Sequence, residues 1–185
     1  MDAVTARGKR RSGAGPAFRA DRERPRHSFL ELPATAEAVP RARQRTRSVL
    51  GEWRLEVIAE TAELLVSELV TNAVKASDGL PSSIGTPPVR LLLAAGHHCA
   101  LVQVWDASSH MPAVPSVPDP LDAEHGRGLL LVETLSAGYG VYRSAGIGKV
   151  VWCVVETPRL GHHAVCLRDV ARPYERPGFQ GRYQS

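Results

Sequence analysis

The sequence has few cysteines, few aromatic residues and no long apolar run. Its 185 residues include three cysteines, which are odd in number and widely spaced and so do not form a disulfide framework. No segment approaches the roughly 20 apolar residues that a membrane-spanning helix needs. The basic N-terminus is not followed by the apolar stretch of a secretory signal. We therefore expect a cytoplasmic protein with one domain, large enough to fold without disulfides or metals.

Acidic residues are scarce near both ends of the chain, so the formal charge of +4 is unevenly distributed. Residues 1–27 carry a net charge of +5, residues 28–157 a net charge of −4, and residues 158–185 a net charge of +3. Arginine outnumbers lysine 20 to 3, which a biased nucleotide composition of the gene would also produce. We therefore expect no nucleic-acid binding except through the basic residues 1–27.

Composition divides the chain into three parts. Residues 1–27 have almost no large apolar side chains and cannot offset the entropy of ordering, so we interpret them as a disordered basic arm. Residues 28–157 contain the periodic segments and form the folded domain. Residues 158–185 are rich in proline and arginine, and their sequence assigns them no structure.

The folded domain begins with one predicted strand and two predicted helices. The strand is the segment HSFLEL, at 27–32. Pro40 requires the first helix to begin near Val39 or to kink there. The second helix runs from about Leu55 to Ser77, with apolar residues at the spacing of three and four that buries one face. These buried positions are Ala62, Val66, Leu69, Val70 and Ala73.

The second half of the domain contains two predicted hairpins, separated by a long loop and a short helix. The hairpins occupy residues 89–106 and 138–156. The loop carries four prolines, and its length exceeds that of an ordinary connection, which indicates a working loop. Helices combined with hairpins predict a two-layer α+β sandwich.

The second helix carries a carboxylate and an amide on one face. Glu68 and Asn72 are four residues apart and therefore neighbours on a helix. One interpretation is an ordinary solvated face. The other is an amide oxygen for a hard cation such as Mg²⁺ beside a carboxylate that takes a proton. On this pair alone the solvated face is the stronger interpretation, although asparagine is a poor helix former and a merely solvated position would suit Glu or Lys better.

Two more candidate sites follow in the chain. Asp106 ends an apolar strand, where it would either cap its own loop or accept a hydrogen bond from an amino group of a bound base. A Gly-x-Gly segment opens the short helix, where N–H groups and the helix dipole favour an anion and an arginine can grip phosphate oxygens. A plain turn needs glycine as well. This segment is Gly126, Arg127 and Gly128.

In this order the motifs resemble those of the ATP-binding anti-sigma factor kinases, bacterial proteins related to the ATPase domains of histidine kinases, gyrase and Hsp90. ELLVSELVTNAVKA resembles the N-box helix of that family, and VQVWDAS resembles its first glycine box. GRGLLLVETLSAGYG and GKVVWCVVE resemble its second glycine box and closing strands. The resemblance covers about residues 28–157. It implies the histidine kinase/Hsp90/gyrase-like ATPase fold, a mixed, mostly antiparallel sheet covered on one face by helices.

The resemblance also implies ATP and Mg²⁺ as cofactors and assigns roles to the candidate residues. Asn72 would hold the Mg²⁺ that bridges the phosphates, and Glu68 would be the catalytic general base toward the attacking hydroxyl. Asp106 would accept a hydrogen bond from the adenine amino group. The lid segment over the phosphates would consist of Gly126, Arg127 and Gly128.

The implied activity is that of a serine kinase that phosphorylates an anti-sigma factor antagonist and sequesters a sigma factor, in a possible homodimer. One position departs from the family pattern, because Ser108 replaces the glycine of the first glycine box, Asp-x-Gly. That glycine lets the backbone approach the nucleotide. A second hypothesis is therefore a protein-interaction module in transcription regulation that keeps the fold but has weak or no kinase activity.

Overall fold

In the described part of the chain, the α-helices cover one face of a five-stranded sheet. A computed structural model describes residues 26–78, 80, 87–96, 98–111, 127–144 and 146–158. The predicted arm at 1–27 and extension at 158–185 lie almost entirely outside these ranges. The elements are β1 (His27–Leu32), α1 (Ala38–Glu52), the 3₁₀ turn η1 (Glu56–Ile58), α2 (Ala59–Asp78), β2 (Val89–Ala95), β3 (Cys99–Asp106), α3 (Arg127–Leu135), β4 (Gly138–Arg143) and β5 (Lys149–Glu156).

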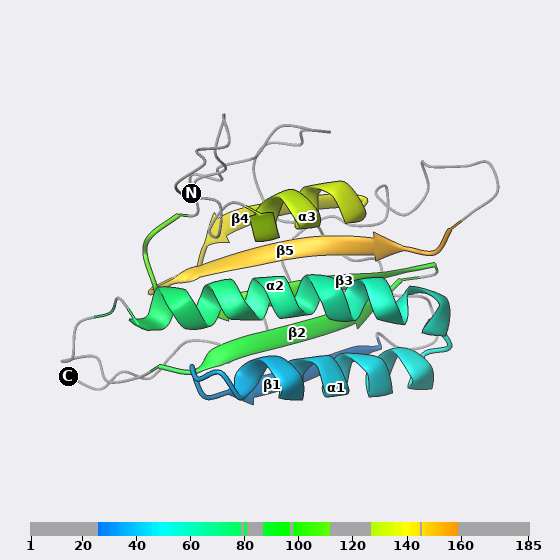
Figure 1. Cartoon of the computed structure of the whole chain (residues 1–185), viewed down its shortest axis with the longest axis horizontal. Coiled ribbons are helices and arrows are strands. Elements are labelled where there is room, and N and C mark those ends of the chain that lie inside the picture. The colour runs from blue at the N-terminus through cyan, green and yellow to red at the C-terminus, as the bar shows by residue number, and fades with distance from the viewer. Residues whose placement is uncertain are drawn as a thin grey trace.

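The sheet has five strands in the order β1-β2-β3-β5-β4. Each of its four pairings is antiparallel. Figure 1 shows α1, α2 and α3 side by side over the sheet, with α2 between the other two. The prediction of a two-layer α+β fold with a mostly antiparallel sheet is therefore confirmed.

The core lies between the helices and the sheet, where the predicted apolar stripe of α2 is buried. All five of its predicted positions are at most 2% exposed. Alternate residues of β3, among them Val102 and Val104, face the same core, while Leu101 and Trp105 belong to clusters outside it. Because each buried aliphatic side chain contributes about 1.5–3 kcal/mol, this stripe fixes the rotation of α2 about its axis.

The first helix begins close to the predicted position. Ala38 is its first residue, so Pro40 lies within the first turn. An N–H group in the first turn has no partner within the helix, and proline therefore costs little there. Of the two alternatives that the sequence left open, a start near Val39 is the one observed.

A bidentate ion pair joins α1 to α2. The Arg47 guanidinium donates from Nε to Glu63 Oε1 at 2.7 Å and from a terminal nitrogen to Oε2 at 2.9 Å. Glu63 is 5% exposed, although it is charged, and it was not among the predicted core positions. The pairing raises the pKa of Arg47, first through this hydrogen bond and then through the charge of Glu63.

We expect Arg47→Ala to lower the thermal unfolding midpoint, because among the described residues it leaves the buried Glu63 carboxylate paired with Arg43 alone, whose Nε is 3.9 Å away. The matched control is Arg41→Ala, which removes an exposed arginine of the same helix. Thermal unfolding followed by circular dichroism measures both. Equal midpoints for the two variants would show that the ion pair does not stabilise the helix packing.

Three findings concern membrane spans and cysteines. Among the described residues, no helix is both long and apolar enough to cross a membrane. Cys153 is a free, buried thiol, and burial raises its pKa to about 12. Cys99 is disulfide-bonded, which the odd number and wide spacing of the cysteines did not predict.

Candidate functional site

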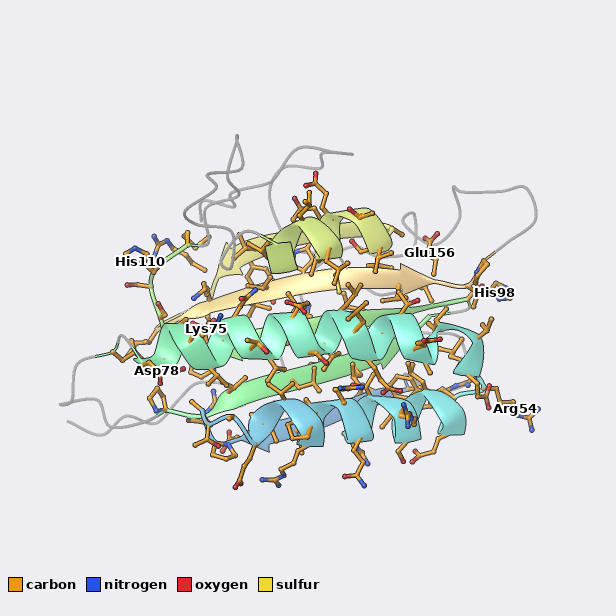
Figure 2. The ribbon with its side chains drawn as sticks, in the orientation of Figure 1. Arg54, Lys75, Asp78, His98, His110 and Glu156 are labelled. Atoms are coloured by element: carbon orange, nitrogen blue, oxygen red, sulfur yellow. The ribbon has the colours of Figure 1, made fainter. Side chains whose placement is uncertain are left out.

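The candidate residues gather toward one end of the sandwich. The hairpin of β2 and β3 turns at the end where Figure 2 labels His98, so β3 reaches Asp106 at the opposite end. Figure 2 shows Lys75 and Asp78, in the last turn of α2, and His110 at that same end. The end of β3 therefore lies near the half of α2 that carries Glu68 and Asn72.

The structure brings Glu68 and Asn72 against the first turn of α3. A Cβ atom placed on Gly128 would lie 2.5 Å from Glu68 Oε2 and 3.7 Å from Asn72 Nδ2. Both side chains are half-buried. They therefore face α3 and are not part of an open solvated surface. Any larger residue at the second position of α3 would force the Glu68 carboxylate to move.

The Gly-x-Gly segment is described only in part. Arg127 is the first residue of α3, so the helix begins inside this segment. Gly126 and most of the proline-rich loop lie outside the described residues. Of the three residues predicted to form a lid, the structure thus places Gly128 beside the carboxylate and the amide of α2.

Asp106 is buried at the end of β3 and is paired with a lysine. It is 1% exposed, and Lys149, its partner in the register between β3 and β5, is 5% exposed. The two side chains form an ion pair in which Lys149 Nζ lies 2.7 Å from Asp106 Oδ1. Burial raises the pKa of Asp106, against a lowering by Lys149 and by a backbone N–H.

Asp106 also caps the loop that follows it. The N–H of Ser108 donates to Asp106 Oδ1 at 2.9 Å, and Ser108 Oγ accepts from the N–H of His110 at 3.1 Å. This is the turn that an aspartate forms with the backbone two residues ahead. The loop-capping interpretation of Asp106 is confirmed, and it leaves one carboxylate oxygen for other partners. Ser108 is buried within this turn.

Sequence reasoning missed Lys149 and Gly148, which hold Asp106 in place. Gly148 has φ +91°, and a Cβ on it would run into the backbone of Asp106 and Ala107. Lys149 opens a strand whose other residues are mainly apolar. A lone lysine at the first position of an otherwise apolar strand is the signal from which an acidic partner could have been expected.

We expect Gly148→Ala to be more destabilising than Gly146→Ala. Both glycines have positive φ, so both substitutions strain the backbone. Only at Gly148 does the new Cβ also meet backbone atoms, whereas Gly146 has open space around it. Urea titration measures the free energy of unfolding of each variant. The additional loss in Gly148→Ala, compared with Gly146→Ala, measures the clash of the new Cβ with the backbone of Asp106 and Ala107. Equal losses would contradict the close approach of β5 to β3 at this point.

The comparison with protein families assigns the chain to a family. The family model described as the histidine kinase-like ATPase domain matches residues 32–155. The matched range holds both α2 residues, Asp106, Gly128 and Lys149. A search of curated proteins found no match.

Proposed function

Because the chain belongs to the histidine kinase-like ATPase domain family, we propose that it binds Mg-ATP between α2, α3 and the end of β3 and acts as a serine kinase. ATP binding follows from the family. The proposed acceptor is a serine of an anti-sigma factor antagonist, and the proposed binding partner is a sigma factor. The observation that carries the proposal is the contact of Gly128 with Glu68 and Asn72.

The residues beside Gly128 fit a magnesium nucleotide. Mg²⁺ prefers oxygen ligands and is usually bound by one or two protein groups together with substrate phosphates and waters. The amide oxygen of Asn72 is such a ligand, and the Asn72 side chain lies beside Gly128 in the first turn of α3. We infer that Asn72 holds the metal, which when bound neutralises charge on the phosphates.

Glu68 is the proposed general base. Its carboxylate takes the proton from the serine hydroxyl while the serine oxygen forms a bond to the γ-phosphorus. The bond between the γ-phosphorus and its bridging oxygen breaks, and ADP leaves with that electron pair. Such transfer depends mainly on positioning and charge neutralisation. The half-buried location of Glu68 against α3 supports this role, because it limits the positions of the carboxylate.

We expect Asp106→Asn to weaken ATP binding about tenfold or more. The substitution removes the negative charge of the carboxylate, whose oxygen accepts the hydrogen bond from the amino group of the base. Asp106 is 1% exposed, so the base makes this contact only once the groups that cover it move aside. The matched control is Asp78→Asn, an exposed acidic residue at the same end of the molecule (Figure 2). Calorimetric titration with ATP, on variants checked for folding, measures both. Unchanged affinity in folded Asp106→Asn would place the base elsewhere.

The same burial favours a second candidate function. Asp106 is buried and paired with Lys149, and Ser108 occupies the position where the family has glycine. Both features disfavour nucleotide binding, so the fold can serve as a protein-interaction module without useful kinase activity. The two candidates are separated by incubating the protein with Mg-ATP and candidate antagonist proteins. Phosphate transfer that depends on Glu68 would exclude the hypothesis of an inactive interaction module. Absence of transfer, in a protein that binds ATP, would favour that hypothesis.

A further inference from the structure

The ion pair between Asp106 and Lys149 is the feature of the site that its proposed function leaves unused. The two side chains face each other across the neighbouring strands β3 and β5 and are almost completely buried. Lys149 Nζ lies 2.7 Å from Asp106 Oδ1. Removing two such groups from water is unfavourable unless their geometry is good and other hydrogen bonds complete it. A lysine at this place therefore needs an explanation beyond the stability of the sheet.

Both hydrogen bonds to Asp106 reach the same oxygen. Lys149 Nζ and the N–H of Ser108 both donate to Oδ1. Within the described part of the chain, no hydrogen bond reaches Oδ2. The pair thus fixes the rotation of the carboxylate and leaves Oδ2 as the oxygen for a ligand.

The charge of the carboxylate decides which base it can bind. A carboxylate only accepts hydrogen bonds, whereas a protonated carboxyl also donates one. Burial favours the protonated form, and a neighbouring cation favours the charged one. An acceptor matches the exocyclic amino group of adenine, and a donor matches a carbonyl oxygen at the same ring position.

Resting on the proposed nucleotide site, we propose that Lys149 is a positioning residue that keeps Asp106 a charged acceptor and thereby sets the preference for a base with an amino group over a base with a carbonyl. The lysine does not touch the base in this proposal. It acts through Asp106, by its charge and by occupying Oδ1.

Among the described residues, the other charged groups near the pair are engaged elsewhere or lie at the surface. Arg143 of β4 is opposite Lys149 in the register and donates to the Ser109 carbonyl at 3.2 Å. Arg90 of β2 lies over the Trp105 ring and binds Glu31. From the end of α2 come Lys75 and Asp78, and from the loop after β3 comes His110, all three exposed (Figure 2). Lys149 is the cation in contact with Asp106.

The test compares affinities for ATP and inosine triphosphate, which has a carbonyl in place of the amino group, between pH 6 and 9. The wild-type protein should prefer ATP at every pH, and so should Lys149→Arg, which keeps the charge. In Lys149→Met the carboxylate loses its cation and binds a proton more readily. Its preference for ATP should therefore fall about tenfold or more as the pH is lowered.

The outcomes separate this inference from the proposed function. A Lys149→Met protein that binds ATP with the wild-type preference and pH profile would overturn the inference alone. No nucleotide binding by the folded wild-type protein would overturn both. If Lys149→Met does not fold, Asp106→Asn with Lys149→Met removes both charges together. That double variant should bind the two nucleotides alike, because an amide both donates and accepts, and a retained preference for ATP would contradict the proposal.

Discussion

Glu68→Gln is expected to slow phosphate transfer about 10²–10⁴-fold, the usual contribution of a general base, while ATP affinity changes little. Glutamine keeps the shape of the side chain and its hydrogen-bonding oxygen but cannot take up the proton of the attacking hydroxyl. The side chain is half-buried against the first turn of α3, so an isosteric change leaves the packing there intact. Transfer of radiolabelled phosphate from ATP to an antagonist protein measures the rate, and calorimetry measures the affinity.

A suitable control is Glu60→Gln, which changes an exposed glutamate near the start of the same helix. It should leave both transfer and affinity unchanged. A Glu68→Gln protein that transfers phosphate at the wild-type rate would remove Glu68 from the catalytic step. Loss of folding in that variant would instead assign the residue a structural role.

Gly128→Ala is expected to slow transfer about 10²-fold without lowering stability. The new Cβ would lie 2.5 Å from Glu68 Oε2, and the clash is relieved most easily by moving the flexible end of that side chain. A displacement of about 1 Å from the productive position can reduce a rate 10²-fold. Alanine is the better helix former by up to about 1 kcal/mol, so the unfolding midpoint should stay the same or rise. Transfer assays and thermal unfolding measure the two effects.

Gly51→Ala provides the matched control, because Gly51 also lies in a helix but has no atom within 4 Å of its added Cβ. It should affect stability alone. Combining Gly128→Ala with Glu68→Gln should cost little more than Glu68→Gln by itself, since both act on one carboxylate. Additive losses would indicate that Gly128 acts on the reaction by another route.

The helices and strands could be predicted because their signals are local. The apolar spacing of α2 is set by one turn of helix, and the five positions that it predicts are all buried. The start of α1 at Ala38 is likewise a local effect, because Pro40 is accommodated in the first turn of a helix but not in its interior. The pairing of β3 with β5 around Asp106 is different, because it joins residues more than forty positions apart in the chain.

The grouping of the candidate residues in space was expected only from the resemblance, because local patterns carry no such information. Spacing places Glu68 and Asn72 on one face of α2, but it does not reveal that the second residue of α3 packs against them. The partner of Asp106 was not visible for the same reason, because no local pattern links a strand-ending aspartate to Lys149. Glu63 was missed because a buried carboxylate depends on Arg47 of another helix.

Calorimetric titration of Mg-ATP into the wild-type protein and into Asn72→Ala tests most directly whether α2, α3 and β3 form a nucleotide site. We expect binding to the wild-type protein that requires Mg²⁺ and that is weakened strongly in Asn72→Ala. Folding of both proteins is checked by circular dichroism. A folded wild-type protein that binds no ATP at millimolar concentration, or an Asn72→Ala protein that binds Mg-ATP as tightly as wild type, would contradict the proposed site.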